Sequence, residues 1–264
     1  MISIILPTLH GDNYTNWCLK SLRENTVNDI QILVHGNEGS PELEKICNQW
    51  DVDYYQRSNF NLGIAKPTNE LAARATGEYI MYTNNDIYSA PGWDVPLLNR
   101  VNDDIFYQYL TPVMFERQFN NPSMNAPMDF GDAPENFREE EFIETWRDKR
   151  KITEDIISTW GPPFMKKALW DHVGGFCEDY FPGWGTDSDL VATIYNTARD
   201  YHNPQPHEFR GVSDCGLYHI QSVGLNKVKD GAMYQATAIQ IFQRKWGMGA
   251  MDMYKMIGDG NKID

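Results

Sequence analysis

Three polar residues, Asn84, Asn85 and Asp86, follow an apolar run at 79–82 that has the pattern of a short buried strand. A carboxylate at the carboxyl end of a strand, with amides beside it, suits a hard divalent cation that keeps open positions for phosphate oxygens. The same residues also form turns readily, so the segment alone leaves both interpretations open. His219 would add a neutral imidazole nitrogen to Asp86, and this pair of ligands suits Mn²⁺ better than Ca²⁺, although a single histidine is more often a structural residue.

The second candidate cluster is the segment FPGWGTDSDL at 181–190. Asp187 and Asp189 stand where a helical stripe of apolar residues begins, and the dipole at the amino end of a helix stabilises carboxylates. An N-cap acid followed by an ordinary first-turn acid would show the same pattern. Trp184 lies between two glycines, which can set an indole against the face of a sugar, with a buried core tryptophan as the alternative. The segment therefore predicts a proton-accepting carboxylate beside a sugar platform.

Both clusters need a sheet to bring them together, and the first hundred residues alternate between strand and helix patterns. Buried strands are expected at 2–6, where Pro7 ends the run, and at 30–34, 52–55 and 79–82. Such alternation predicts a parallel sheet with helices on both faces. The loops at 7–12, 35–40 and 83–88 would then converge at the carboxyl ends of the strands, where open α/β sheets bind ligands.

The alternation stops at about residue 111. The charged stretch at 136–151, NFREEEFIETWRDKRK, favours a solvated helix flanked by loops, with a lid or acceptor-binding insertion as the alternative. Near the end of the chain, Ile239, Phe242 and Trp246 have helical spacing, which predicts a helix at about 230–247 that packs back on the domain.

Composition excludes several classes of protein. The 264 residues include 23 Lys and Arg against 37 Asp and Glu, and a net charge of −14 argues against a nucleic-acid partner. The four cysteines form no CxxC pair and are expected to be free thiols in a reducing compartment. We find neither a secretory leader nor an apolar run long enough to span a membrane, so a cytoplasmic protein is expected. Without GxGxxG, GxxxxGK[ST] or GxSxG motifs, dinucleotide, ATP-driven and serine-hydrolase chemistry lose support.

Four segments, in order along the chain, match segments of one family. They are SIILPT, NFNLGIAKPTNELAARATGEYIMYTNND, PPFMKKALWDHVGGF and GWGTDSDL. Together they resemble the GT-A glycosyltransferases, in particular the large inverting family 2, over most of residues 1–225. The last segment also resembles the GWGGED segment of animal galactosyl- and N-acetylgalactosaminyltransferases.

The resemblance implies a single α/β domain of the Rossmann-like GT-A fold, with a mostly parallel mixed central sheet and helices on both faces. The catalytic domain would span 1–225, with a nucleotide-sugar-binding half at 1–110, an insertion at 112–158 and an acceptor and catalytic half at 159–225. Residues 226–264 would form a C-terminal helical extension.

The resemblance also implies roles for single residues. Asp86 would bind Mn²⁺ or Mg²⁺ together with the nucleotide diphosphate, and His219 would be a further ligand. Asp187 would be the catalytic base and Asp189 would orient the acceptor or the base, although the GWGGED alignment shifts the base role towards Asp189. The residues expected at the nucleotide sugar are Pro7, Thr8, Asn37, Asn61, Lys66, Asn84 and Asn85. Those expected at the acceptor or sugar are Trp184, Gly185 and Trp160.

The implied activity is metal-dependent, inverting transfer of a hexose or N-acetylhexosamine from a nucleotide sugar, UDP-linked by preference, to a hydroxyl of a glycan, lipid-linked or protein acceptor. The chain departs from the family where Asn37 and Glu38 replace a usual pair of acids and where Asn84 replaces the first acid of the DxD motif. A sugar nucleotidyltransferase is one alternative, but PTLHGDNY lacks the expected Gly-rich basic loop. A non-catalytic carbohydrate-binding protein is another, whereas a glycosidase would give Asp86 no role.

Overall fold

The computed structural model describes residues 1–117, 126–150, 162–200, 202–220 and 228–260. The strands in this part of the chain are β1 (Ile2–Leu9), β2 (Ile30–Asn37), β3 (Tyr54–Ser58), β4 (Tyr79–Tyr82), β5 (Ile87–Ser89), β6 (Tyr107–Glu116), β7 (Ala126–Pro127), β8 (Phe164–Lys166) and β9 (His207–His219). The helices are α1 (Asp12–Asn25), α2 (Pro41–Gln49), α3 (Ala65–Ala72), α4 (Asp94–Asn99), the short 3₁₀ turn η1 (Pro134–Asn136), α5 (Glu139–Lys149), α6 (Lys167–Val173), α7 (Thr186–Ala198), α8 (Gly231–Trp246) and α9 (Ala250–Gly260).

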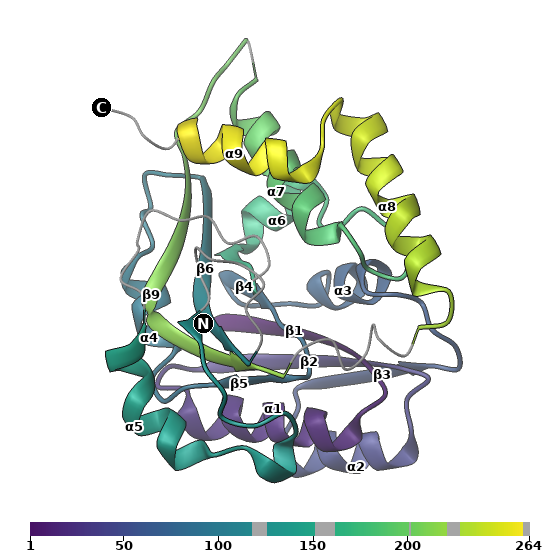
Figure 1. The fold of residues 1–264 in the computed structure, drawn as a ribbon, viewed down its shortest axis with the longest axis vertical. Helices are drawn as coiled ribbons and strands as arrows, with labels where there is room; N and C mark the ends of the chain where they lie inside the picture. The colour runs from purple at the N-terminus through teal and green to yellow at the C-terminus, as the bar shows by residue number, and fades with distance from the viewer. Residues whose placement is uncertain (118–125, 151–161, 201, 221–227, 261–264) are drawn as a thin grey trace.

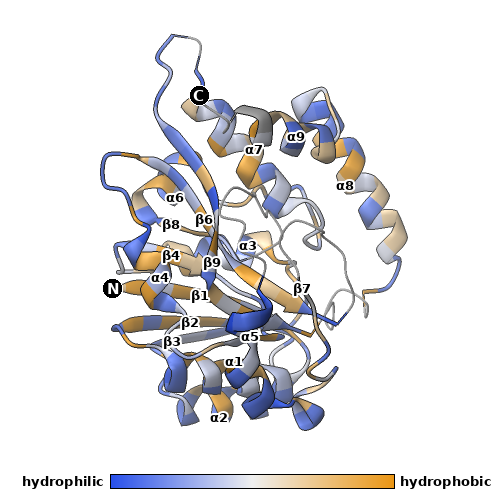
Figure 2. Cartoon of the chain, turned by 60° about the vertical axis from the view of Figure 1, so that its left-hand side comes forward, coloured by the Kyte–Doolittle hydropathy of each residue, from blue (hydrophilic) through white to orange (hydrophobic). Residues whose placement is uncertain are grey.

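The strands form one mixed sheet in the order β3-β2-β1-β4-β8-β6-β9-β5, and β7 pairs with β6 outside this path (Figures 1 and 2). Strands β1 to β4 pair in parallel, as the alternation of strands and helices predicts. β8 runs antiparallel to both of its neighbours, and β5 runs antiparallel to β9. The expected α/β domain with a mostly parallel mixed sheet is therefore confirmed.

The expectation that Pro7 ends the first strand is wrong, because β1 continues to Leu9. Pro7 pairs with His35 of β2, whereas the pairing of β1 with β4 ends at Ile5 and Tyr82. A proline removes one backbone donor. The last bond of β1 with the β4 chain is from the Thr83 amide to the Ile5 carbonyl at 3.0 Å, so the missing donor of Pro7 falls where that ladder stops, and β1 continues beside β2 to Leu9.

Helices cover both faces of the sheet (Figure 1). On one face, α1, α2 and α4 pack on a buried cluster that includes Ile4, Leu6 and Ile32. On the other face, α3, α6 and α7 pack on a cluster that includes Ile5 and Leu33. Neighbouring residues of one strand thus enter opposite clusters, as the two-residue period of a strand requires.

The C-terminal helices share the second of these clusters. Ala238 and Phe242 of α8 and Met253 and Ile257 of α9 are buried together with residues of α7. The helix expected at 230–247 is confirmed as α8. Phe242 packs on this cluster as its spacing predicts and Trp246 is partly buried against it, whereas Ile239, expected on the same stripe, is 53% exposed. These helices therefore belong to the same core as the sheet, but their buried face includes Ala238 in place of Ile239.

The charged stretch 136–151 contains α5, whose Phe142 and Trp146 are fully buried in a third aromatic cluster with Phe115 and Tyr218. Its outward side is hydrophilic (Figure 2). The helix is therefore amphipathic and covers the β6–β9 end of the sheet. Strand β6 itself runs through Glu116, past the expected start of the insertion.

No helix among the described residues is long and apolar enough to cross a bilayer. The cysteines Cys18, Cys47, Cys177 and Cys215 are free thiols, as expected.

Candidate functional site

Three ionisable residues meet where β5, β9 and β6 lie side by side. His219 pairs with Ile87 of β5 on one side and with Glu116 of β6 on the other, so Asp86, one residue before Ile87, reaches the same place. The Nε2 atom of His219 is 3.3 Å from Oδ1 of Asp86, and its Nδ1 atom is 2.6 Å from Oε1 of Glu116. The backbone fixes this arrangement further, because the Ile220 amide donates to the Asp86 carbonyl at 2.9 Å.

His219 lies between Asp86 and Glu116 in a row of three ionisable side chains, and the two carboxylates stabilise the protonated imidazole. Burial alone would lower the pKa of His219, but the charges and hydrogen bonds of Asp86 and Glu116 raise it to about 10. With only these carboxylates facing it the imidazole is protonated, and a divalent cation bound at Nε2 would take the place of that proton. Within the described residues there is no cluster of three or more His, Cys, Asp or Glu side chains arranged to hold a metal ion. Asp86 and His219 could supply two ligands, and Glu116 lies behind the histidine.

The two asparagines before Asp86 have structural contacts. Asn85 is buried, and its amide donates to the His10 carbonyl at 3.1 Å and to the Thr15 hydroxyl at 3.0 Å. Asn84 accepts a hydrogen bond from the hydroxyl of Tyr82. The contacts of Asn85 tie the loop after β4 to the loop after β1 and to α1, so both asparagines have structural roles in this turn.

Asp187 lies in the first turn of α7. Burial, together with the charges of Asp187 and Asp86, raises the pKa of the Tyr82 phenol, so both carboxylates lie within electrostatic reach of one side chain. Burial also raises the pKa of Asp187 itself to about 6. The Ser188 amide, which donates to Oδ1 at 2.9 Å, opposes this rise because it stabilises the carboxylate. The carboxylate is thus ionised at neutral pH but is a stronger base than an ordinary aspartate.

Asp189, two residues further on, has very different surroundings. Its Oδ1 atom accepts from the Tyr180 hydroxyl at 3.1 Å and from Trp246 Nε1 at 2.8 Å, and its Oδ2 atom lies 2.7 Å from Nζ of Lys245. Its carboxylate is almost fully buried. Both oxygens are therefore occupied by donors from the protein.

The turn that leads into α7 depends on glycine. Gly185 has φ of 86°, and a Cβ there would lie 3.0 Å from the Tyr180 ring. Trp184 is half-buried against the main cluster, and α8 begins at Gly231 directly beside the far edge of its indole. Part of Trp184 is thus core and part remains accessible as a platform. Trp160 lies outside the described residues.

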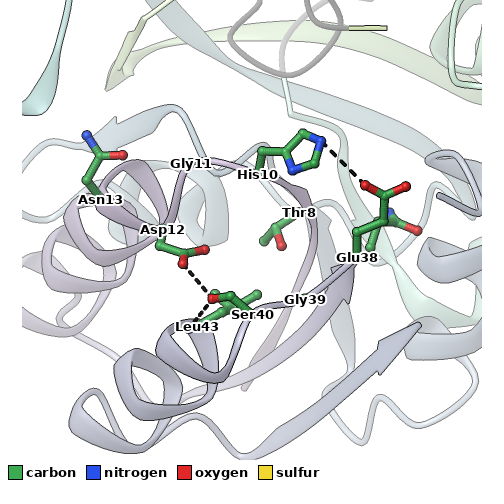
Figure 3. Close-up of a pocket in the computed structure, with 10 residues that line it drawn as sticks. Thr8, His10, Gly11, Asp12, Asn13, Glu38, Gly39, Ser40 and Leu43 are labelled. Atoms are coloured by element: carbon green, nitrogen blue, oxygen red, sulfur yellow. Dashed lines mark hydrogen bonds and ion pairs between the residues drawn. The ribbon is translucent and has the colours of Figure 1, made fainter. Parts of the chain in front are cut away.

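A pocket of about 370 Å³ opens at the carboxyl ends of β1 and β2 (Figure 3). Thr8 and Asn37, both expected at the nucleotide, line it, whereas Pro7 lies one residue before it on β1. Across the pocket, His10 lies 3.6 Å from Glu38, and the Ser40 hydroxyl donates to Asp12 at 2.6 Å.

The amide of Asn37 is also a structural clamp. Its Oδ1 atom accepts from the Leu62 amide at 2.9 Å, and its Nδ2 atom donates to the Gly63 carbonyl at 3.1 Å. Asn61 accepts from the Gly63 amide at 2.8 Å and so closes the same loop. Lys66, on α3, is exposed and does not line the pocket.

Sequence reasoning missed several residues at these places. Glu116 ends the long apolar strand β6, and a polar residue at the carboxyl end of a buried strand was the available signal. Lys245 carried no local signal, because its partner is 56 residues away. His10, Asp12 and Ser40 lie in the two loops that the sequence places at the ligand edge, although none of them stood out by type.

The fold matches that of solved GT-A glycosyltransferases. The crystal structure of TarS from S. aureus has a TM-score of 0.60 at 16% identity, and the match covers 95% of this chain and 44% of TarS. The crystal structure of GalNAc-T7 with UDP, GalNAc and Mn²⁺ has a TM-score of 0.61 at 11% identity, and covers 98% of this chain and 54% of that one. At such identities the likeness is one of fold.

The sequence defines the family. The model of Glycosyl transferase family 2 matches residues 3–170, and the chain belongs to this family. EpsH of Bacillus subtilis (strain 168) is 23% identical over 106 residues, which are 39% of this chain and 31% of EpsH. The chain thus spans less than half the length of EpsH and of TarS. The family match ends before Asp187, so the role of that residue depends on its geometry.

Proposed function

We propose that this chain carries out metal-dependent, inverting transfer of a hexose or N-acetylhexosamine from a UDP-linked sugar to a hydroxyl of a glycan, lipid-linked or protein acceptor. The observation that carries the proposal is that the charges of Asp86 and Asp187, from opposite halves of the chain, both raise the pKa of the Tyr82 phenol. The two carboxylates therefore lie near one side chain. A diphosphate site and a proton acceptor on the two sides of one sugar require such proximity.

The nucleoside would occupy the pocket at Thr8 and Asn37. The hydroxyl, carboxylate and imidazole groups that line this pocket can form hydrogen bonds with the base and the ribose. The carboxyl ends of parallel strands are where α/β sheets bind such ligands. Structures of TarS with UDP and with UDP-GlcNAc support a UDP-linked donor. Asn61 and Lys66 would lie near the diphosphate, and Asn84 and Asn85 would shape the loop that carries Asp86.

Asp86 and His219 fit a divalent cation, because a buried carboxylate and an imidazole nitrogen are ligands that Mn²⁺ accepts. The Mn²⁺ in the GalNAc-T7 structure supports this choice. The bound cation would neutralise the charge that grows on the departing diphosphate. Glu116 would accept the Nδ1 hydrogen of His219 and so direct Nε2 towards the cation site.

Asp187 would take the proton from the acceptor hydroxyl as its oxygen attacks the anomeric carbon. The bond from that carbon to the diphosphate breaks on the opposite face, so one base gives inversion. The raised pKa of Asp187, about 6, suits a base that works near neutral pH. The exposed part of Trp184, next to Gly185, would stack against a sugar at this end of the site.

The experiment is a panel of UDP-glucose, UDP-galactose, UDP-GlcNAc and UDP-GalNAc with Mn²⁺, with release of UDP as the readout. We expect one donor to release UDP, and Asp187→Asn and Asp86→Ala to abolish the release. UDP with Mn²⁺ should raise the melting temperature of the wild type but not of Asp86→Ala. Sugar binding without UDP release would instead favour a carbohydrate-binding protein, and pyrophosphate release from UTP and a sugar phosphate would favour a nucleotidyltransferase.

A further inference from the structure

The two residues that follow Asp187 are both attached to the C-terminal helices. Asp189 holds Lys245 and Trp246 at the end of α8, at 2.7 and 2.8 Å. Ser188 accepts a hydrogen bond from the hydroxyl of Tyr254 in α9. Helices α8 and α9 therefore both form hydrogen bonds with the first turn of α7, at the adjacent residues Asp189 and Ser188.

The turn that they grip carries Asp187. The Ser188 amide donates to the Asp187 carboxylate at 2.9 Å, and the Asp189 amide donates to the Gly185 carbonyl at 2.9 Å. The chain just before this turn passes through Gly183 and Gly185, and glycine restricts the backbone least. The contacts with α8 and α9 add to those of the preceding loop, where the amide and the hydroxyl of Thr186 donate to the Gly183 carbonyl at 3.3 and 2.8 Å.

The contact between Asp189 and Lys245 is a strong constraint because its two partners differ in exposure. The Asp189 carboxylate is 2% exposed, whereas the Lys245 side chain is 38% exposed. A buried carboxylate that loses a cationic partner is left with an uncompensated charge, which disrupts its surroundings far more than the loss of a surface pair. Apolar contacts of Phe242, Met253 and Ile257 with the α7 cluster bring both helices to this position.

We propose that α8 and α9 form a latch that positions the base Asp187, with Asp189, Lys245 and Tyr254 as positioning residues. This inference rests on the proposed role of Asp187. It assigns the proposed proton transfer to one carboxylate, Asp187, and the attachment of the turn to α8 to the other, Asp189. A reacting group displaced by about 1 Å can lose about 10²-fold in rate, so the latch would act on turnover without touching the donor.

The kinetic test compares Lys245→Met with Arg244→Met. Both changes remove one positive charge from the same end of α8, but Arg244 is exposed and its side chain bonds to its own helix at Gln240. With the UDP-sugar that the donor panel identifies, and with Mn²⁺, Lys245→Met should lower kcat for UDP release at least 10-fold and leave KM for the donor within twofold. Lys245→Arg should restore most of kcat, and Arg244→Met should match the wild type.

Amide hydrogen exchange tests the same latch without substrate. The segment 186–190 should exchange at least 10-fold faster in Lys245→Met than in the wild type or Arg244→Met. Tyr254→Phe, which keeps the ring and removes only the bond to Ser188, should give a smaller increase and covers the case in which Lys245→Met does not fold. If Lys245→Met and Tyr254→Phe fold and exchange like Arg244→Met, the latch is overturned. If the wild type releases no UDP from any donor, the proposed function fails, and the exchange rates alone decide whether the helices hold the turn.

Discussion

The Nδ1 atom of His219 lies 2.6 Å from Oε1 of Glu116, and the two residues are direct partners in the parallel register of β6 and β9. A carboxylate in this position fixes the orientation of the ring and leaves Nε2 facing Asp86 at 3.3 Å. The histidine of this row is thus oriented by a residue 103 positions away in the chain.

We expect Glu116→Gln to weaken Mn²⁺ binding by about 10- to 100-fold, because a carboxylate behind a ligating histidine orients the ring and makes it more basic. The measurement is the Mn²⁺ concentration that half-saturates the UDP-dependent rise in melting temperature. Glu144→Gln, an exposed change on α5, is the control. An unchanged half-saturating concentration in a folded Glu116→Gln protein would remove Glu116 from the site.

Asp187→Asn should lower kcat by about 10²- to 10⁴-fold, because the amide cannot accept the acceptor proton. The UDP- and Mn²⁺-dependent rise in melting temperature should stay as in the wild type, since Asp187 does not touch the nucleotide in the proposed site. Asp179→Asn removes an exposed carboxylate eight residues earlier and should leave both readouts unchanged. Equal kcat in the Asp187 and Asp179 variants would show that another group is the base.

The pH dependence of activity follows from the same group. Because burial raises the pKa of Asp187 to about 6, the base is progressively protonated and kcat should fall as the pH drops through 6. Replacement of Mn²⁺ by Mg²⁺ should leave the midpoint of this limb in place. A limb centred near the ordinary aspartate value of about 3.9 would contradict the assignment.

Asp187 should also make stability depend on pH. Its folded pKa, about 6, lies above the unfolded value of about 3.9, so the folded chain binds more protons between these values. Its contribution to the free energy of unfolding therefore decreases as the pH rises through this window. Relative to the wild type, Asp187→Asn should gain melting temperature from pH 4 to pH 7. A constant difference between the two proteins over this range would refute the raised pKa.

Asn37→Asp should destabilise the protein by about 1–3 kcal/mol, because it replaces a buried donor with a carboxylate oxygen facing the Gly63 carbonyl. The free energy of unfolding in urea is the measurement. Asn102→Asp is the control, because the exposed side chain of Asn102 accepts a hydrogen bond from the Asp104 amide, and an aspartate can do the same. Equal stability of the two variants would show that the clamp on Gly63 contributes nothing.

Local pattern was sufficient for the parallel half of the sheet. The apolar runs of β1, β2 and β4 are each continuous, because both of their faces are buried, and their order fixed the edge at which Asp86 lies. Pro7 was misread because a strand-ending proline and a proline past the last paired neighbour look alike in sequence. Only the lengths of β1 and β4 relative to each other distinguish them.

The surroundings of the candidate site residues depend on contacts between segments far apart in the chain, which local sequence patterns do not predict. Asp187 and Asp189 are of the same type and two residues apart, and it is the contacts of Lys245 and Trp246 that give them different surroundings. Likewise, Glu116 enters the row with His219 through the register of β6 and β9, which has a shift between Pro112 and Val113. Such a shift has no signature in composition or periodicity.

The two hydrogen bonds of Asn85 have a thermodynamic consequence. They join the loop that carries Asp86 to the His10 carbonyl at the mouth of the Thr8 pocket and to α1 through Thr15. The nucleoside and the diphosphate of one ligand would therefore bind to two loops that Asn85 already holds together. Little chain entropy would be lost when such a molecule arrives, and more of each contact would appear as affinity.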